Sequence, residues 1–312
     1  MKIVVIGSLN VDTTYSLPHI PKEGETILAT NKTVQRGGKG QNQAIQMARL
    51  GAEVSMIGAV GSDGDGKELI DGLKLENIDT TGMIIKEGPS GTASIYVNSE
   101  GQNNIVVYPG ANFQLTKEDI DSKLDILKNA DICVMQNEIP LDVIYHVLEL
   151  CRKLDVAMVH NPAPAVKEFE KKYLGLIDYF VPNETEMELI LNRELDSDVE
   201  SMAREVLQLG CKNIIITLGS KGSLLVNDEK VYSQEALRVK AVDTTAAGDS
   251  YIGGFVAGLA RGFDLERAME YGTISSALTV TKPGAVDALP YRKDVDEMEK
   301  RLKNKGNSEN FW

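Results

Sequence analysis

The segment Asp243–Asp249, with the sequence DTTAAGD, places a carboxylate among small residues directly ahead of a predicted helix. It follows a strand-like run, Leu237–Val242, and it precedes a glycine-rich helix predicted for Ser250–Arg261. Small residues at a helix start leave backbone N–H groups free, and the helix dipole adds positive potential, so this turn can hold a transferring phosphate. Asp249 beside such an anion hole could take a proton from a hydroxyl nucleophile. The alternative interpretation is that Asp249 only caps the helix.

Polar groups that suit a sugar occur in two other segments. The sequence GGKGQN at Gly37–Asn42 precedes a predicted helix; its glycines permit close backbone approach to a ligand, and Lys39 adds a donor. Asn10 and Asp12 alternate along an extended segment after the first predicted strand, so both side chains can point the same way. Amide and carboxylate groups fit the vicinal hydroxyls of a sugar. The alternative for each segment is an ordinary polar turn.

Two further strand ends suit a nucleotide and its metal. TLGSKG at Thr217–Gly222 is a glycine loop that could approach nucleotide phosphates, and PNETE at Pro182–Glu186 opens a helix. Glu186 could contact a water bound to Mg²⁺, which prefers oxygen ligands and keeps its waters; the alternative is a helix-capping acid. Neither Gly37–Asn42 nor the end of the first strand matches a Walker A or GxGxxG motif. A nicotinamide-dependent enzyme is therefore a remote alternative.

Short apolar runs alternate with amphipathic segments along the chain, which predicts a parallel sheet covered by helices on both faces. Gly51 and Gly210 follow two of the predicted helices, where glycine suits a left-handed cap. The predicted strands are Lys2–Ile6, Val54–Val60, Asp131–Met135, Val156–Val159, Tyr179–Val181 and Asn213–Thr217. The predicted helices between them are Asn42–Leu50, Lys67–Leu75, Leu141–Leu154 and Val199–Leu209.

Two segments interrupt this alternation, at about 12–36 and 91–108. The second reads as strands Thr92–Val97 and Asn104–Tyr108 around a turn, and both segments predict antiparallel strands inserted into the α/β frame. A small sheet beside a large α/β domain can act as a lid. The polar end of the chain, Asn307–Trp312, is expected to fray.

Composition limits the classes of protein and partner. With 33 basic and 46 acidic residues among 312, the formal net charge is −13, which argues against a nucleic-acid or anionic-membrane surface. Three widely spaced cysteines and three scattered histidines indicate neither a disulfide framework nor a zinc or histidine-based catalytic site. No apolar stretch is long enough to cross a membrane. We expect a cytoplasmic protein.

Together these segments resemble the ribokinase-like (PfkB) carbohydrate kinase family over roughly residues 1–295. GGKGQNQA at Gly37–Ala44 and DTTAAGD are similar to the two family signatures, and NPAPA at Asn161–Ala165, PNETE and TLGSKG occur in the family's order. The resemblance implies a ribokinase-like fold over 1–312. This fold is α/β: one large parallel-sheet, Rossmann-like domain, covered by helices on both faces, with a small β-sheet lid. The lid is also implied to form a homodimer interface.

The resemblance also implies an activity, the transfer of the ATP γ-phosphate to a sugar hydroxymethyl, with ribose and its 5-hydroxyl as the expected acceptor. By match of motif, Asp249 resembles the catalytic base, and the backbone of Ala246, Ala247 and Gly248 resembles the anion hole. The implied sugar ligands are Asn10, Val11, Asp12, Gly38, Lys39, Gly40, Gln41, Asn42, Glu138 and Asp249. The implied ATP ligands are Asn183, Thr217, Leu218, Gly219, Ser220, Lys221, Gly222, Gly248 and Thr273.

Two cations follow from the same resemblance. Mg²⁺ is expected with ATP, with Glu186 acting through water. Potassium is expected as an activator beside the anion hole, held mostly by carbonyls. Ala288 departs from the family pattern, which usually offers a serine hydroxyl there. The implied potassium positions are Asp243, Thr245, Thr279, Lys282, Gly284 and Ala288.

The choice of sugar rests on few residues. A buried carboxylate at Glu138 favours a polar pentose such as ribose over a purine, and the few aromatic residues in the lid segments, Tyr15, Tyr96 and Tyr108, offer little for stacking a base. Other kinases of the family, such as a fructokinase, a deoxyribokinase or a nucleoside kinase, stay open. A non-catalytic sugar sensor is a further alternative, against which Asp249 and Gly248 argue.

Overall fold

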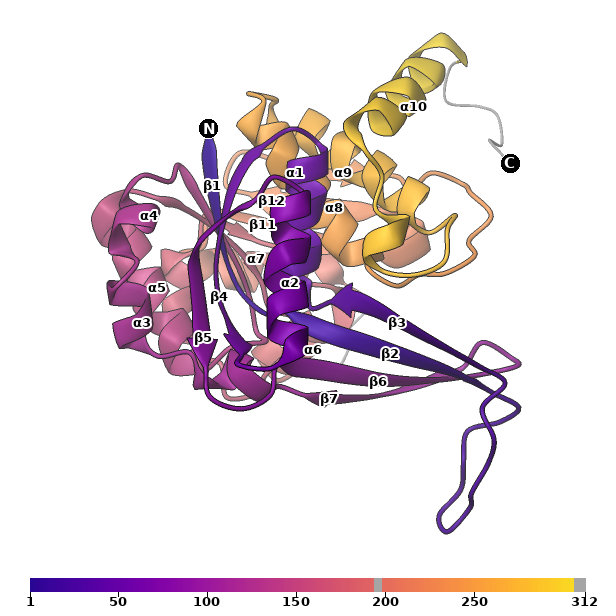
Figure 1. Cartoon of the computed structure of the whole chain (residues 1–312). Coiled ribbons are helices and arrows are strands. Elements are labelled where there is room, and N and C mark those ends of the chain that lie inside the picture. Colours follow the sequence, from indigo (N-terminus) through magenta and orange to yellow (C-terminus); the bar gives the residue numbers. More distant parts are fainter. Residues whose placement is uncertain (194–197, 306–312) are drawn as a thin grey trace.

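A nine-stranded sheet forms the centre of the computed structural model, which describes residues 1–193 and 198–305 (Figure 1). The predicted frayed end, Asn307–Trp312, lies outside the described residues. The strand order is β13-β12-β11-β10-β9-β8-β1-β4-β5. The seven neighbours from β11 to β5 in this order pair in parallel, and β12 and β13 are antiparallel. Their bounds are β1 Lys2–Ile6, β4 Glu53–Gly61, β5 Asp79–Lys86, β8 Ile132–Gln136, β9 Ala157–Asn161, β10 Tyr179–Phe180, β11 Asn213–Thr217, β12 Ser223–Asn227 and β13 Val231–Gln234.

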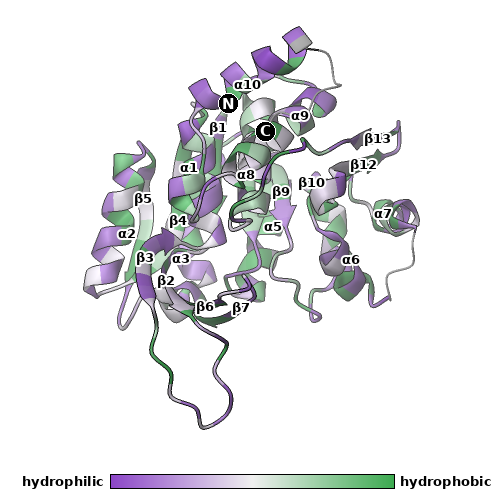
Figure 2. Ribbon diagram, turned by 90° about the vertical axis from the view of Figure 1, so that its right-hand side faces the viewer, coloured by the Kyte–Doolittle hydropathy of each residue, from purple (hydrophilic) through white to green (hydrophobic). Residues whose placement is uncertain are grey.

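Helices cover both faces of this sheet, so alternate residues of a strand enter two different cores (Figure 2). In β1, Val4 and Ile6 pack on one side, and Ile3 and Val5 pack on the other. A strand buried on both faces must be apolar throughout, which is why the continuous runs predicted β1, β4, β8, β9, β10 and β11. The sequence analysis did not predict β5, β12 and β13, which lie at the two edges of the sheet. The helices on the Ile3 side are α1 Lys39–Arg49, α2 Gly64–Leu75, α8 Ala247–Ala260 and α9 Leu265–Thr279. Those on the Val4 side are α3 Lys117–Asp121, α4 Leu124–Lys128, α5 Leu141–Leu154, α6 Glu184–Leu191 and α7 Val199–Gln208.

Shorter elements complete the chain. Gly51 and Gly210 follow α1 and α7 with φ angles of 88° and 98°, as the predicted left-handed caps require. The last helix, α10 Arg292–Lys305, packs against α8 and α9 through a small separate cluster. The 3₁₀ helices are η1 Gly110–Gln114, η2 Lys171–Leu176, η3 Gly219–Lys221 and η4 Val286–Ala288. No helix among residues 1–193 and 198–305 has the length and apolar character needed to span a bilayer.

A second sheet of four strands extends from the body of the molecule, in the order β3-β2-β6-β7 (Figure 1). The two hairpins, β2 with β3 and β6 with β7, are antiparallel as predicted. The expectation of antiparallel pairing is wrong for the central pair, because β2 and β6 run parallel. They follow β1 and β5, whose carboxyl ends lie at the same edge of the large sheet, so both leave in the same direction. The bounds are β2 Asn10–Leu17, β3 Asn31–Gly37, β6 Gly91–Asn98 and β7 Asn103–Tyr108.

The predicted strand Leu237–Val242 is absent from the structure. The sheet ends at β13, so the residues that follow have no neighbouring strand to bond. Instead, the N–H groups of Val242 and Asp243 both donate to the carbonyl of Val280, at 2.7 and 3.2 Å. This contact ties the chain to the end of α9 before it enters α8, which begins three residues earlier than predicted.

Candidate active site

A cavity of about 250 Å³ opens where the amino-terminal ends of α1 and α8 meet the carboxyl ends of the parallel strands. Ligands of open α/β sheets bind at this edge because the strand-to-helix loops converge there. Lys39 and Asp249 lie in its wall with the three predicted anion-hole residues. The other lining residues are Asn161, Ala163, Val181, Asn183, Glu186, Thr217, Thr244 and Ile252.

Asp249 is the third residue of α8 and is buried. Its Oδ2 accepts a hydrogen bond from Nδ2 of Asn42 and its Oδ1 accepts one from Nε2 of Gln43, both at 2.9 Å. The interpretation of Asp249 as the helix cap is wrong, because Ala246 occupies that position with a left-handed φ of 58°. The carboxylate is therefore held against α1 with its side chain at the cavity.

The turn before α8 exposes backbone donors. The N–H of Ala247 bonds to the carbonyl of Thr244 at 3.2 Å, whereas the N–H of Gly248 has no recorded partner within residues 1–193 and 198–305. A Cβ added at Gly248 would meet nothing within 4 Å, so open space lies beside it. A free N–H at a helix start next to an open cavity has the geometry that binds an anion.

The predicted sugar-binding residues gather on the α1 side of Asp249. Oε2 of Glu138 accepts hydrogen bonds from the backbone N–H of Lys39, at 3.0 Å, and from the hydroxyl of Ser8. Oδ1 of Asp12 and Oδ1 of Asn42 are buried without a hydrogen-bond partner in the described part of the chain. Because buried polar atoms are normally paired, these two oxygens mark positions that a ligand hydroxyl can satisfy.

Charge is concentrated here. Burial raises the pKa of Asp12 to about 7, and repulsion by Glu138 and Asp249 adds to the effect. Burial alone would lower the pKa of Lys39, but attraction by the carboxylates, with Asp249 first and Glu138 second, outweighs it and raises that pKa. Lys39 is thus a fixed cation among several carboxylates.

The remaining residues of the sugar set have structural contacts. A Cβ at Gly40 would lie 2.5 Å from the backbone nitrogen of Ser8, so this glycine lets α1 begin against the end of β1 rather than against a ligand. Gly38 has a φ of 90°. The side chain of Gln41 donates to the carbonyl of Gly37 at 3.0 Å, and Val11 packs on the apolar core.

A wider hollow of about 580 Å³ adjoins the first cavity and shares Ala247 and Gly248 with it. Of the predicted ATP ligands, it is lined by Asn183, Thr217, Gly219, Ser220, Gly222, Gly248 and Thr273. Leu218 and Lys221 are not in its wall; Leu218 packs on the core and Lys221 pairs with Glu184 at 3.7 Å. The residues of the absent strand, Leu237, Val239 and Ala241, supply an apolar side with Val280.

Asn183 and Glu186 form a capping box at the start of α6. Oδ1 of Asn183 accepts from the N–H of Glu186 at 2.8 Å, and the carboxylate accepts from the N–H of Asn183 at 2.9 Å and from its Nδ2 at 3.0 Å. The interpretation of Glu186 as a helix-capping residue is thus correct. Burial raises the pKa of Glu186. Glu186 nevertheless lines the same cavity as Asp249.

The predicted potassium residues belong to two segments that Asp243 joins. Its Oδ1 accepts from the N–H and hydroxyl of Thr245, at 2.9 and 2.7 Å, and its Oδ2 accepts from the N–H of Gly284 at 2.8 Å. Burial opposes ionisation, but these hydrogen bonds outweigh it and lower the pKa of Asp243. The carbonyl of Thr279 accepts from the N–H of Lys282 at 3.1 Å, and Ala288 is buried.

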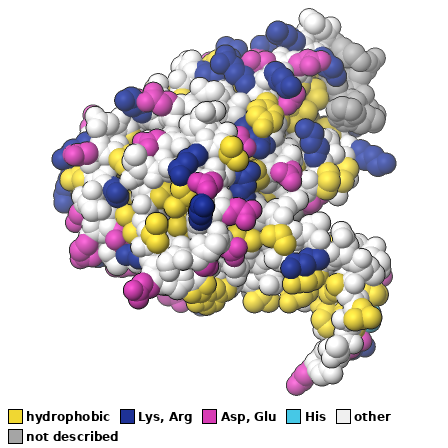
Figure 3. Space-filling model, viewed as in Figure 1, with side chains coloured by type: hydrophobic (Ala, Val, Ile, Leu, Met, Phe, Trp, Pro, Cys, Tyr) yellow, Lys and Arg dark blue, Asp and Glu magenta, His cyan; other side chains and the backbone are white. Residues whose placement is uncertain are grey.

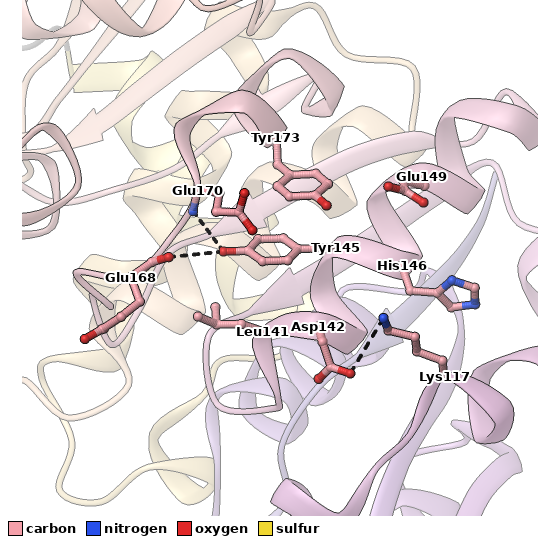
Figure 4. A pocket seen from close by; sticks show the side chains of 9 residues that line it. All are labelled: Lys117, Leu141, Asp142, Tyr145, His146, Glu149, Glu168, Glu170 and Tyr173. Atoms are coloured by element: carbon pink, nitrogen blue, oxygen red, sulfur yellow. Dashed lines mark hydrogen bonds and ion pairs between the residues drawn. The ribbon is translucent and has the colours of Figure 1, made fainter.

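A separate hollow of about 490 Å³ lies on the Val4 side of the large sheet, between α5 and η2 (Figure 4). Tyr145 stacks on Tyr173 with ring centroids 4.0 Å apart. The Tyr145 hydroxyl accepts from the N–H of Glu170 at 2.8 Å and donates to the carbonyl of Glu168 at 3.4 Å. The Tyr145 hydroxyl in this hollow is thus already hydrogen-bonded within the protein. We therefore take the cavity at Asp249 as the candidate site.

A family model described as pfkB family carbohydrate kinase matches residues 1–292 of this chain. The chain belongs to the pfkB family. This membership confirms the predicted fold and the predicted class of enzyme, a carbohydrate kinase.

Individual pfkB relatives cover almost the whole chain. A ribokinase of Staphylococcus aureus is 39% identical over 303 residues, which cover 95% of this chain and 99% of that protein. A deoxyribokinase of Salmonella typhi is 37% identical over 302 residues, covering 95% and 98%. The structure of Arabidopsis thaliana ribokinase complexed with ribose and ATP matches with a TM-score of 0.87 at 30% identity, covering 96% of this chain and 98% of that one.

Sequence reasoning missed four buried amides around this site. Asn112 accepts from the N–H of Leu9 and donates to Oδ1 of Asn10, at 3.0 and 2.9 Å, and so fixes the Asn10 side chain. Gln43, Gln136 and Asn161 form a hydrogen-bonded group that reaches Asp249. The sequence did carry a hint of buried glutamines, because several recur along the predicted helix after Gly37, a helix expected to pack against an apolar sheet.

Proposed function

We propose that this carbohydrate kinase transfers the γ-phosphate of ATP to the 5-hydroxyl of ribose. The observation that carries the proposal is that Ala247 and Gly248 belong to both cavities, with Asp249 beside them in the smaller one. A phosphate donor in the wider hollow and a hydroxyl acceptor near Glu138 would then meet at the start of α8. In-line transfer needs little more than such positioning and charge stabilisation.

Asn10, Asp12 and Asn42 would accept or donate hydrogen bonds to the ring hydroxyls, with Lys39 and Glu138 completing the polar wall. Asp249 would accept the proton of the attacking hydroxyl as the hydroxyl oxygen bonds to the γ-phosphorus, while the bond from that phosphorus to the β–γ bridging oxygen breaks and ADP leaves. The backbone N–H groups of Ala246, Ala247 and Gly248 would stabilise the charge on the transferring group. The side chain of Asn42, bonded to Asp249, would link sugar binding to the placement of the base.

ATP would occupy the wider hollow, with its base against the apolar side and its phosphates toward Gly248. Mg²⁺, which kinases use with ATP, neutralises phosphate charge when bound. Glu186 suits this ion because it is one of two carboxylates in the cavity wall, the other being Asp249. Its contact would run through a metal-bound water, since Asn183 holds its carboxylate.

Ribose is favoured over deoxyribose by the ribokinase relatives and the many hydroxyl-binding groups, although a deoxyribokinase is among the relatives. The test is ADP release with Mg-ATP and ribose, deoxyribose, fructose or adenosine as acceptor. We expect the highest kcat/KM with ribose. A higher value with any of the other three would reject ribose as the preferred substrate, while ADP release with none of them would reject the proposed activity.

Potassium would activate the enzyme by bracing the turn before α8, with carbonyls of the Thr279–Leu289 segment as ligands and Asp243 as the nearby charge. The carboxylate of Asp243 already joins Thr245 to Gly284, so both segments lie together. Turnover in potassium chloride should exceed that in tetramethylammonium chloride at equal ionic strength. Equal turnover in the two salts would reject the site.

The small sheet would close over the sugar as a lid and pair with a second copy, within one domain spanning residues 1–312. Its outer strand β7 is exposed along its length, with Ile105, Val106 and Val107 each at least half exposed, and hydrophobic side chains gather over this sheet (Figure 3). Ribose should slow hydrogen exchange at 12–36 and 91–108. Val106→Lys should convert a dimer to a monomer in sedimentation; a monomeric parent protein would reject the interface.

A further inference from the structure

The buried glutamines beside Asp249 form a chain of hydrogen bonds that ends on its carboxylate. Nε2 of Gln136 donates to Oε1 of Gln43 at 2.7 Å, and Nε2 of Gln43 donates to Oδ1 of Asp249 at 2.9 Å. A glutamine amide has one acceptor and one donor end. Since the Asp249 carboxylate only accepts, the donor end of Gln43 must face it, which leaves the acceptor end of Gln43 for Gln136. Nε2 of Gln43 also reaches Oδ1 of Asn161 at 3.2 Å.

The end of β1 leaves room for the hydrogen-bonded side chains of Gln136 and Gln43. A Cβ at Gly7 would lie only 2.1 Å from Oε1 of Gln136, so the end of β1 can carry no side chain there. Gln43 and Gln136 are completely buried, and neither lines the cavity. Gln43 therefore contacts the carboxylate from the side away from the cavity, and Gln136 acts on it only through Gln43.

We propose that Gln136 and Gln43 are positioning residues, an amide relay that fixes the plane of the Asp249 carboxylate for proton transfer. The inference rests on the proposed function of Asp249 as the base. Asn42 holds Oδ2 and Gln43 holds Oδ1, so two donors from adjacent residues of α1 define the plane. A cationic donor would bind the carboxylate more strongly but oppose its protonation, whereas a neutral amide orients it at lower cost to its basicity.

The test compares Gln43→Met with Gln46→Met. Gln46 lies one turn further along the same helix and is equally buried, but it bonds to the Pro290 carbonyl at 3.2 Å and to Ser250 at 3.4 Å. Gln43→Met should lower kcat by roughly 10- to 100-fold, because small displacements of a reacting group cost about that much. KM for ribose and for ATP should change less than about threefold.

The pH dependence separates positioning from general damage. Loss of a hydrogen bond to an ionised carboxylate makes its protonation easier, so the acid limb of the kcat profile should move to higher pH in Gln43→Met. Gln46→Met should lose a similar amount of thermal stability with an unchanged profile and a kcat within about threefold of the parent. Equal kinetic effects in the two variants, or an unchanged kcat in Gln43→Met, would overturn the relay.

Gln136→Met examines the outer link. It should act in the same direction as Gln43→Met but less strongly, and the double variant should be no slower than Gln43→Met alone, because both changes interrupt one chain. Multiplicative losses in the double variant would show two independent effects and contradict the relay.

A spectroscopic measurement keeps the relay separate from the proposed function. In protein labelled with ¹⁵N-glutamine and without substrates, the side-chain amide signal of Gln43 should shift on Asp249→Ala, while that of Gln46 should not. If this response occurs but no sugar is phosphorylated, the hydrogen-bonded chain holds and the proposed function fails. If ribose is phosphorylated and the Gln43 signal does not respond, the relay is wrong.

Discussion

On the proposed sugar side of Asp249, polar side chains hold one another in place, whereas on the proposed nucleotide side the wall consists mainly of small and apolar residues. Asn112 fixes Asn10, and Asn42 and Gln43 fix Asp249. The wider hollow has Ala236, Leu237 and their neighbours along one side, on a segment outside any strand. A pre-organised polar wall discriminates between sugars, because its hydrogen bonds can all be satisfied only by a sugar with hydroxyls in the matching positions. An open wall of small residues instead lets backbone groups approach phosphates.

The strongest test of this contrast removes the group at the boundary. Asp249→Asn should lower kcat by about 10²- to 10⁴-fold, the usual contribution of a general base, while KM for ATP stays within a few-fold. Steady-state kinetics and ribose binding by calorimetry measure the two sides separately. A variant with nearly normal turnover would contradict the assignment of the base.

Glu138→Gln should affect the sugar side alone. The change leaves the N–H of Lys39 and the Ser8 hydroxyl with a poorer acceptor, and a mismatched buried partner costs about 1–3 kcal/mol. KM for ribose should therefore rise about 10- to 100-fold. The matched change on the other side is Thr273→Val, in the wall of the wider hollow, which should raise KM for ATP only a few-fold. If either variant weakened both ligands equally, the division into two sides would fail.

Asp12 should make the stability of the ligand-free protein depend on pH. Its pKa is about 7 in the folded protein, above the ordinary value of 3.8, so the folded state holds this proton more tightly than the unfolded chain. Stability contributed by this proton is present at pH 4 and is lost as pH rises toward 7 and above. Asp12→Asn should therefore stabilise the protein at pH 8, on the order of 1–2 kcal/mol, with little effect at pH 4.

Urea unfolding of Asp12→Asn and the parent at both pH values checks this. The variant should also bind ribose poorly, since it lacks the carboxylate. A gain in stability that is the same at pH 4 and pH 8 would mean that titration of Asp12 is not its cause.

His160 gives the smallest expected effect, in the core behind the site. The side chain is completely buried between Phe169 and Phe180, and neither ring nitrogen has a partner in the described part of the chain. Burial lowers its pKa to about 3. His160→Leu should raise the free energy of unfolding by about 1 kcal/mol at pH 8, because an unpaired polar group is removed.

The gain from His160→Leu should grow as pH falls from about 6.5. In that range the unfolded histidine takes up a proton that the folded one excludes, so the parent loses stability and the variant does not. Kinetic constants should be unchanged. A loss of stability at pH 8 would indicate a hydrogen bond to His160 that the structure lacks.

Much of the large sheet was predictable because burial on both faces leaves a strand no polar positions. Lys2–Ile6, Asn213–Thr217 and the helix Leu141–Leu154 coincide with β1, β11 and α5. Leu237–Val242 also has a strand-like pattern, with Arg238 and Lys240 alternating with apolar residues, but a local pattern alone does not provide a neighbouring strand. The pairing of β2 with β6 likewise depends on where distant strands end rather than on local sequence.

The sequence predicted that Asp249 and Lys39 lie at the candidate site, but not which residues hold them in place. Asp249 and Lys39 stood out through their glycine-rich surroundings. Gln43 has no such mark, since glutamine on a helix usually faces solvent. Its burial follows from the packing of α1 on α8, where Gly253 lets the helices come close: a Cβ there would lie 2.6 Å from Cβ of Gln46. Such contacts join residues more than two hundred positions apart.

The most direct test of the whole account is the position of the phosphate in the product. The protein would be incubated with Mg-ATP and ¹³C-labelled ribose, and the product examined by ³¹P and ¹³C NMR. We predict ribose 5-phosphate and ADP in equal amounts, with carbon 5 coupled to phosphorus. Phosphorylation at another hydroxyl, or release of inorganic phosphate instead of a sugar phosphate, would contradict the proposal that the 5-hydroxyl meets the γ-phosphate beside Asp249 at the start of α8.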